Sequence, residues 1–375
     1  MMDVRAPIKL AIVGARGIPA SYGGFETFAE EVSVRLVQRG VDVTVFCEVQ
    51  GAFSLPTYKG VKLKYLPGFR LGSLSPIVSD IWALWIARRG FNVIYVLGYP
   101  AAPFFVVPRL FGTRVWVNLD GLEWRRSKWG ILGRIYLRLM EAVAVRFPDR
   151  TIADAVAIRT HLARRHARTV DCQVIEYGAD IVSQPPDTQS LAEFSVEPGR
   201  YFLVICRLEP ENHVMEIVHG YVKSKSGLSL LIVGDGLPNS EYVRRLKEVS
   251  DARVRFVGAV YDRTKLRTLR FHCKAYLHGH SVGGTNPSLL EALGCGCVVI
   301  AHDNPFNREV CEDVAWYFQH EDEIPEAISV IDSYDTMIRA EIAGNARSRI
   351  RDRYSWKRIT DRYMELLNGG SSPVV

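Results

Sequence analysis

The chain has 375 residues, of which 48% are hydrophobic and 23% are charged, as in globular proteins. This composition excludes disordered, collagen-like and coiled-coil chains, and the length predicts two domains. No apolar run reaches the roughly 18 to 20 residues that cross a bilayer, because Pro100 and Pro103 interrupt the best candidate, 93–107. The seven cysteines are scattered without Cys-x-x-Cys spacing, which indicates small buried side chains in a cytoplasmic protein.

The positive charge lies in the first half of the chain. Residues 1–180 contain 24 Lys and Arg against 15 Asp and Glu, whereas residues 181–375 contain 23 against 26. This asymmetry predicts an acidic partner for the N-terminal half: nucleic acid, an anionic membrane surface or a phosphate-bearing acceptor. We expect no nucleic acid, because aromatic residues do not alternate with bases along any predicted exposed strand.

Short apolar strands alternate with amphipathic helices from the N-terminus onward. In the first half we expect strand 9–14, helix 25–38, strands 42–47 and 62–66, helix 77–89, and strands 93–97 and 114–118. The second half repeats the pattern, with strands 201–206, 229–233, 254–257, 274–277 and 298–301 and helices 240–249 and 287–293. The alternation predicts parallel sheets covered by helices.

Proline-rich sequence with little periodicity divides the two halves. We therefore predict an N-terminal domain over 1–180, a linker over 181–199 and a second domain over 200–346. The tail, 347–375, is expected to form a helix that packs back on the first domain and then frays. The fold class is α/β, with two Rossmann-like, doubly wound domains facing a cleft.

A glycine-rich turn follows the first strand. Gly14 and Gly17 precede the pair Gly23-Gly24, a poor match to the Gly-x-Gly-x-x-Gly fingerprint of dinucleotide-binding proteins. Glu48 keeps NAD binding open, since it follows the second strand where a ribose-binding acid would lie. The longer turn is better suited to surrounding a ligand with backbone amides at a helix N-terminus.

The second half contains a denser cluster, 278–300, that predicts strand, glycine-rich loop, helix and strand. Pro287 fits the first turn of a helix, which would direct unpaired amides near Ser288 and Leu289 at a diphosphate. Glu291, one turn later, is either a ribose ligand or a solvated helix acid. The pairs Cys295/Cys297 and His278/His280 lack zinc-site spacing, so we expect no metal.

Four segments carry a more specific resemblance: 14–26, 207–212, 278–291 and 302–309. With them the chain resembles retaining glycosyltransferases of the GT-B architecture, the large family with a Glu-x7-Glu signature, and within it the bacterial rhamnosyltransferase branch. The resemblance implies acceptor binding by the first domain and nucleotide-sugar binding by the second.

The resemblance implies roles for individual residues. Arg207 would contact the donor diphosphate and assist catalysis, and Glu291 would bind the nucleotide ribose. The chain departs from the family at two places, with Gly283 where the first glutamate is usual and Asn212 where lysine is usual. Losing both members of a charge pair preserves the balance of charge, and His280 and Asn286 are the nearest candidates to replace them. The predicted donor-binding residues are Gly17, Gly23, Gly24, Arg207, Tyr261, His280, Gly284, Thr285, Asn286, Ser288, Leu289 and Glu291.

The acceptor side is expected at the end of the last N-terminal strand. Asp120 would orient or deprotonate the acceptor, although Asp120-Gly121 is also a typical turn. No metal is required if Arg207 and helix amides stabilise the leaving diphosphate, and no Asp-x-Asp motif occurs in the chain. The predicted acceptor-binding residues are Tyr22, Glu26, Glu123, Trp124 and Arg125.

Residues 124–150 combine bases with apolar side chains. Seven bases and two acids over 125–150 alternate with apolar residues after Trp124, which is typical either of a helix at an anionic membrane surface or of a packed helix with a solvated basic face. The first alternative would hold the enzyme on the inner face of the cytoplasmic membrane.

The predicted activity is transfer of a deoxyhexose, rhamnose from dTDP-rhamnose, to a lipid-linked oligosaccharide in capsule, O-antigen or exopolysaccharide assembly. A non-hydrolysing nucleotide-sugar epimerase of the same architecture and an NAD-binding Rossmann protein remain alternatives.

Overall fold

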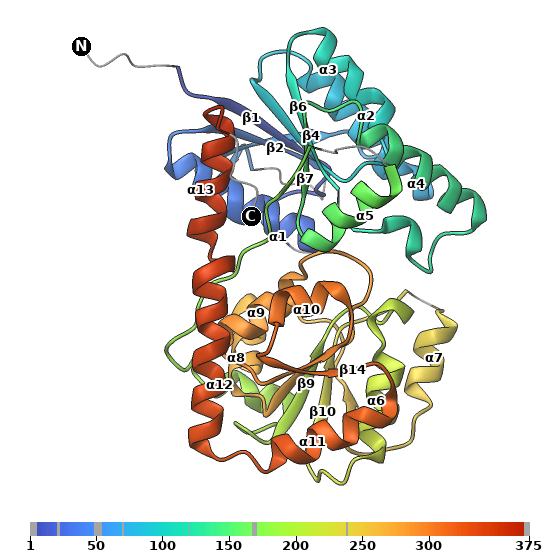
Figure 1. The fold of residues 1–375 in the computed structure, drawn as a ribbon, viewed down its shortest axis with the longest axis vertical. Helices are drawn as coiled ribbons and strands as arrows, with labels where there is room; N and C mark the ends of the chain where they lie inside the picture. The colour runs from blue at the N-terminus through green and yellow to red at the C-terminus, as the bar shows by residue number, and fades with distance from the viewer. Residues whose placement is uncertain are drawn as a thin grey trace. The chain divides into compact units, whose positions relative to one another are not determined.

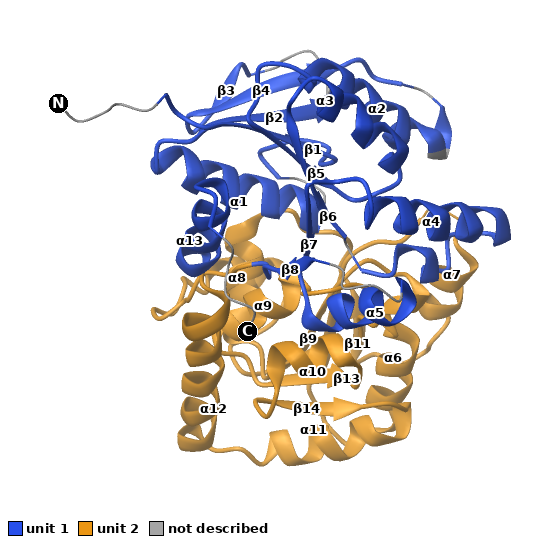
Figure 2. Ribbon diagram, turned by 45° about the horizontal axis from the view of Figure 1, so that its top comes forward, with its two compact units in different colours: residues 1–177, 356–375 blue, residues 178–355 orange. Residues whose placement is uncertain are grey.

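The computed structural model describes residues 6–20, 23–48, 55–69, 71–119, 121–166, 171–237 and 239–370 (Figure 1). The chain forms two compact units (Figure 2). Unit 1 comprises Met1–Tyr177 and Trp356–Val375, and unit 2 comprises Gly178–Ser355. Each unit is an α/β layer structure built on a parallel sheet, so the expected fold class is confirmed.

Unit 1 contains, within its described residues, a sheet of eight strands in the order β3-β4-β2-β1-β5-β6-β7-β8. Neighbouring strands are parallel except for the short edge strand β3, which runs antiparallel to β4. Buried residues fill both faces of β1, β2 and β5, as expected for a sheet covered by helices on both sides. The strands are β1 (Lys9–Val13), β2 (Asp42–Glu48), β3 (Thr57–Tyr58), β4 (Val61–Leu66), β5 (Val93–Leu97), β6 (Arg114–Asn118), β7 (Arg150–Ala153) and β8 (Cys172–Val174).

The helices of unit 1 form layers on the two faces of this sheet. Helices α1 and α13 pack together on one face, and α2 and α3 lie on the other (Figure 1). The helices are α1 (Gly24–Gln38), α2 (Ser75–Ala87), α3 (Val106–Leu110), α4 (Ile131–Ala144), α5 (Val156–His166) and α13 (Trp356–Leu367), with short 3-10 turns η1 (Gly72–Leu74), η2 (Ala102–Phe105) and η3 (Glu123–Arg125).

Helix α13 is anchored in unit 1 by a buried aromatic cluster. Its Tyr363 packs against Phe28 of α1, and its hydroxyl is 2.8 Å from that of Tyr95 in β5. Arg362 pairs with the buried Glu176 at 2.7 Å. These contacts bury the last helix against a sheet formed some 200 residues earlier in the chain.

Unit 2 is built on a parallel sheet in the order β11-β10-β9-β12-β13-β14, six strands over the described residues. Helices α8, α9 and α12 pack together in one layer, and α6, α7 and α11 in another. The strands are β9 (Tyr201–Ile205), β10 (Ser229–Val233), β11 (Val254–Phe256), β12 (Ala275–His278), β13 (Val299–His302) and β14 (Ala315–Phe318). The helices are α6 (Val214–Lys223), α7 (Glu241–Lys247), α8 (Arg263–His272), α9 (Pro287–Cys295), α10 (Pro305–Cys311), α11 (Ile324–Asp332) and α12 (Thr336–Arg349), with 3-10 turns η4 (Gln189–Phe194), η5 (Pro210–Asn212) and η6 (Glu321–Glu323).

Two segments differ from the sequence prediction. The predicted linker, 181–199, belongs to unit 2, where η4 buries Leu191 and Phe194. The predicted single helix over 347–367 is instead the end of α12, a π-helical turn (Ile350–Tyr354) and α13. The break follows from the unit boundary at Ser355: residues before it pack in unit 2 and those after it pack in unit 1.

Two further expectations concern the burial of the cysteines and the lack of a segment that crosses a membrane. Six of the seven cysteines are buried, and Cys206 is half-buried; all seven are free thiols. Of the helices in the described ranges, none has both the length and the apolar character needed to cross a membrane.

Candidate active site

The candidate site lies at the carboxyl edge of the sheet in unit 2. Because its strands are parallel, the segments that follow β9, β12 and β13 meet at one edge. We call these segments the β9 loop (206–213), the β12 loop (279–286) and the β13 loop (303–304). They contain five of the twelve residues predicted to bind the donor, and α9, which follows the β12 loop, carries three more.

Hydrogen bonds join the three loops. The amide of Ser281 donates to the carbonyl of Glu211 at 3.0 Å, and Nδ2 of Asn304 donates to the carbonyl of His280 at 3.1 Å. The His213 ring stacks on the His302 ring, with centroids 4.1 Å apart, and its Nε2 lies 3.0 Å from Oγ of Ser281. The loops therefore form one connected cluster.

The two positions that depart from the family pattern lie on either side of His280. Oδ1 of Asn212 is 2.7 Å from Nδ1 of His280, and Nδ2 of Asn212 donates to the carbonyl of Arg207 at 2.7 Å. Gly283 has φ +140°, and a Cβ built there would lie 2.9 Å from Nε2 of His280. The imidazole thus occupies the space that a side chain at position 283 would enter. Of the two proposed replacements, His280 makes this contact.

The prediction of unpaired amides at the start of α9 is wrong. Asn286 caps the helix: its side chain accepts from the amide of Ser288 at 2.9 Å, and its carbonyl accepts from the amide of Leu289 at 3.1 Å. Oγ of Ser288 points inward and lies 2.8 Å from the hydroxyl of Tyr276, and Leu289 is fully buried. These residues hold α9 against the sheet.

Glu291 forms an ion pair with Arg270, a residue that the sequence did not single out. Nη2 of Arg270 is 2.7 Å from Oε2 of Glu291 and 3.0 Å from Oγ of Ser288. The Arg270 side chain is only 6% exposed, whereas that of Glu291 is 40% exposed. Burial lowers the pKa of Arg270, but Glu291 together with Tyr276 and two nearby cysteines outweighs burial and holds this pKa above its ordinary value. Glu291 is therefore oriented by a buried cation and presents an accessible carboxylate.

Two histidines at the strand ends are held neutral. Burial, together with Arg270, lowers the pKa of His278 to about 3, and burial with the nearby His213 lowers the pKa of His302 to about 4. Within the described part of the chain, Nε2 of His278 has no hydrogen-bond partner.

The other predicted donor residues differ in accessibility. Arg207 is exposed, with Nη1 3.3 Å from Oε1 of Glu209, so its guanidinium is accessible to an anion. Tyr261 is exposed, whereas Gly284 and Thr285 are buried. Of the predicted donor residues in unit 2, Arg207, Tyr261 and Glu291 thus present accessible polar groups, and His280 is half-buried.

Several further residues predicted to bind the donor or the acceptor lie in unit 1, on the turn between β1 and α1 or at the start of α1. Gly17 has φ +140°, and Gly23 and Gly24 begin α1. Glu26 is buried, and its carboxylate accepts from the amide of Arg16 at 3.0 Å, so it stabilises the turn. Tyr22 and Asp120 lie outside the described residues.

The predicted acceptor residues after β6 form an internal network. Glu123 pairs with Arg126 at 2.6 Å and Lys128 at 2.8 Å; burial raises its pKa, but these cations outweigh burial and hold the pKa below its ordinary value. Nε1 of Trp124 donates to the buried Glu141 at 3.0 Å. Arg125 is exposed.

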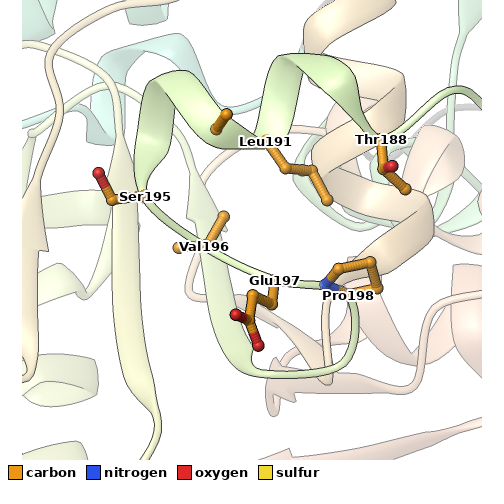
Figure 3. A pocket seen from close by; sticks show the side chains of 7 residues that line it. Thr188, Leu191, Ser195, Val196, Glu197 and Pro198 are labelled. Carbon is orange, nitrogen blue, oxygen red and sulfur yellow. The ribbon is translucent and has the colours of Figure 1, made fainter.

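Metal ligands and cavities add little to the site. Over the described residues, no group of three or more His, Cys, Asp and Glu side chains could hold a metal ion. Residues of the segment 188–198, which contains η4, line a pocket (Figure 3). This segment precedes β9 and belongs to none of the three loops.

Sequence reasoning missed Arg270, His213, His302 and Asn304. One signal was present for the last of these: Asn-Pro occurs at the start of both α9 and α10, and in each case the asparagine caps the helix. The contact between Arg270 and Glu291 has no such signature.

Comparison with known protein families agrees with this location of the site. Residues 188–330 match the family model "Glycosyl transferases group 1", and residues 8–180 match "Domain of unknown function (DUF1972)". Unit 2 carries a group 1 glycosyltransferase domain. The coarser part of the expected resemblance is thereby confirmed, and the matched range contains every residue of the three loops.

Known relatives and structures are distant. The N-acetylgalactosamine-N,N'-diacetylbacillosaminyl-diphospho-undecaprenol 4-alpha-N-acetylgalactosaminyltransferase of Campylobacter jejuni is 23% identical over 131 residues, 33% of this chain and 35% of that enzyme, so the match spans about a third of its length. HepE of Anabaena in complex with UDP and glucose is 20% identical, covers 96% of this chain and 100% of its own, and has a TM-score of 0.77. Sucrose-phosphate synthase of Thermosynechococcus elongatus is 16% identical, with 97% and 99% coverage and a TM-score of 0.78. These structures establish the GT-B fold.

Proposed function

We propose that the protein is a retaining glycosyltransferase that moves a sugar from a nucleotide-sugar donor to a lipid-linked saccharide. The observation that carries the proposal is the group 1 glycosyltransferase domain, whose matched residues include the loop cluster around Arg207, His280 and Glu291. Two relatives support the partners: HepE was solved with UDP and glucose, and the Campylobacter enzyme acts on a diphospho-undecaprenol-linked saccharide.

For the donor we propose dTDP-rhamnose, bound without a metal. Arg207 would bind the diphosphate, since an exposed guanidinium pairs well with phosphate oxygens. Glu291 would accept hydrogen bonds from the ribose. Asn212 and Gly283 supply no charged side chain at the positions where the family usually has lysine and glutamate, which suits a 6-deoxy sugar with fewer hydroxyls.

The reaction breaks the bond between the anomeric carbon and the diphosphate oxygen, and it forms a bond from that carbon to the acceptor oxygen. Negative charge develops on the leaving nucleoside diphosphate, and Arg207 would stabilise it. The acceptor proton passes to Asp120, which we propose as the residue that orients or deprotonates the acceptor. The products are the nucleoside diphosphate and the extended saccharide.

Helix α4 supports a location on the inner face of the cytoplasmic membrane. Its exposed apolar residues Ile131, Leu132, Ile135 and Leu139, which we call the α4 patch, lie on the same short helix as Arg134 and Arg138. A helix with exposed apolar side chains and adjacent bases suits the surface of an anionic bilayer, where the lipid-linked acceptor is found.

The test combines ligand binding with transfer. The purified chain is mixed with dTDP, UDP or NAD, and the thermal midpoint is measured; dTDP should raise it, since a ligand that binds only the native state stabilises that state. Transfer from dTDP-rhamnose and from UDP-sugars to a polyprenyl-diphosphate saccharide is then followed by product mass. NMR of the product reports whether the anomeric configuration is retained.

Arg207→Ala should lose the stabilisation by dTDP, whereas Arg245→Ala, which removes an exposed arginine of α7, should keep it. Unchanged activity after dialysis against EDTA is expected for metal-free binding of the donor. Stabilisation by NAD alone, or conversion of the sugar nucleotide without an acceptor, would replace the proposal with the dehydrogenase or the epimerase alternative.

A further inference from the structure

Exposed apolar side chains are concentrated in one part of unit 1. Of the twenty large hydrophobic residues that are exposed in the described chain, fourteen lie between Leu71 and Phe147. Scattered exposed apolar residues are normal, but a concentration of this kind marks an interaction surface. The α4 patch explains only part of it. Six of the other ten lie on α2, η2 and α3 or directly after α3.

We call these residues the α2–α3 patch and define it by Trp82, Trp85, Phe104, Val106, Leu110 and Phe111. Trp82 and Trp85 are three residues apart on α2 and so share a face, while Ala83, Leu84 and Ala87 of the same helix are buried. Trp85 is 48% exposed and Leu110 is 77% exposed. The helices pack on the sheet with one face and present large apolar side chains on the other.

Arginines surround these aromatic rings. The guanidinium of Arg88 lies 4.0 Å from the ring centroid of Trp85, and that of Arg89 lies 4.4 Å from the ring centroid of Phe111. The stretch 71–119 contains four arginines and one acid, Asp80. Burial and the nearby Glu48 raise the pKa of Asp80 to about 8, so this carboxyl is neutral at neutral pH. The patch is therefore apolar and cationic.

The α2–α3 patch is continuous with the α4 patch. Turn η2 contacts α2, α3 and α4, and the hydroxyl of Tyr136 in α4 donates to the carbonyl of Pro100 at 2.6 Å. Arg109 of α3 pairs with Asp149, just beyond α4, at 3.3 Å. Figures 1 and 2 both show α2, α3 and α4 side by side on one side of unit 1.

We propose that the α2–α3 patch is a second docking surface for an anionic lipid bilayer, so that unit 1 rests on the membrane through α2, α3 and α4 together. Tryptophan with neighbouring arginine is the combination that favours the headgroup region, where the ring is buried and the cation meets lipid phosphate. The proposal extends the membrane contact proposed for α4. It requires no transfer activity.

The experiment measures binding of the full chain to sucrose-loaded vesicles of phosphatidylcholine, with or without a quarter of phosphatidylglycerol. The wild type should bind the anionic vesicles preferentially. Trp82→Ser/Trp85→Ser should lower the partition coefficient at least tenfold, and Arg89→Gln about fivefold, the contribution of one base near an anionic surface. A matched control, Leu237→Ser/Met337→Ser, removes two exposed apolar residues of unit 2 and should not change it.

A second readout does not depend on the strength of vesicle binding. Brominated lipids quench tryptophan within the bilayer, so they should quench wild-type fluorescence more than that of Trp82→Phe/Trp85→Phe. Equal partitioning of the serine variant and the wild type would overturn the proposal. A second result would also overturn it: the wild type forms a dimer in sedimentation velocity, the serine variant does not, and neither binds vesicles. The patch would then bind a second copy of the chain. If the wild type binds vesicles but transfers no sugar, the result would contradict the proposed function and leave the docking surface standing.

Discussion

The buried pair of Arg270 and Glu291 allows the two roles of Glu291 to be separated. Glu291→Gln keeps the shape of the side chain and removes its charge. The guanidinium of Arg270, 6% exposed, would then remain buried without a counter-ion. We therefore expect this substitution to destabilise unit 2, even though Glu291 itself is an accessible residue of the candidate site.

The magnitude follows from the burial of each partner. Removing one partner of a fully buried ion pair costs about 3–5 kcal/mol. Glu291 is 40% exposed, so water already screens part of the attraction, and loss of one charged hydrogen bond, about 2 kcal/mol, is the better guide. A domain of this size loses roughly 2–4 °C per kcal/mol, which predicts a decrease of roughly 4–8 °C in the midpoint of unit 2.

A double-mutant cycle tests this reasoning. Arg270→Met removes the buried cation, so Arg270→Met/Glu291→Gln should be more stable than the sum of the single effects by roughly 1–2 kcal/mol. Scanning calorimetry of the full chain measures the midpoints, and the same scans with dTDP measure binding. The double variant should regain stability without regaining the shift caused by the nucleotide, because Glu291, the residue proposed to bind the ribose, is still absent.

Additive effects of the two substitutions would refute the argument, because they would mean that the partners do not interact in solution. A matched control is Glu193→Gln, which breaks the exposed pair of Glu193 and Lys265 at 2.6 Å in the same unit. Its midpoint should stay at the wild-type value, since exposed ion pairs contribute little.

Three further predictions concern single residues. Asp80→Asn should raise the thermal midpoint at pH 8 but not at pH 4, because an acid whose pKa is raised to about 8 in the fold destabilises it increasingly as pH rises between these values; midpoints across pH 4–8 check this. The pKa values of His278 and His302 are lowered to about 3 and 4, so both side chains take up protons when the protein unfolds below pH 6.5. The free energy of unfolding should therefore fall by up to about 1.4 kcal/mol per pH unit for each histidine as the pH is lowered. His302→Gln should make this dependence of stability on pH less steep. Gly283→Ala should lower the midpoint and weaken stabilisation by dTDP, because φ is +140° and the new Cβ would lie 2.9 Å from Nε2 of His280; an unchanged scan would contradict this.

The strands and their order along the chain could be predicted because they depend on local patterns. All ten predicted strands form, within two residues of the expected ends, since each is a short apolar run bounded by turn residues. The start of α9 was also predictable, because Pro287 follows a capping asparagine. The short strands β3, β7, β8 and β14 were missed.

Contacts between distant elements were beyond local reasoning. The sequence predicts that the last helix packs on the first domain, and α13 does belong to unit 1, but the contact of Tyr363 with Tyr95 across 268 residues has no local signature. The cap of α9 is a local feature, and it was nevertheless predicted wrongly. The helix start was placed correctly, but its amides were assumed to be free for a ligand, whereas the side chain of Asn286 satisfies one and its carbonyl the other.

The geometry around His280 explains why the two departures from the family pattern belong together. A lysine at position 212 would lose the hydrogen bond of Asn212 to His280 and would find no acid at position 283, where Gly283 has no side chain. A glutamate at position 283 would meet the His280 ring, 2.9 Å from its first side-chain atom. Either change alone therefore introduces a charge without a partner or a steric clash. Positions 212, 280 and 283 consequently form one structural unit, and a substitution at one of them is expected to require compensating changes at the other two.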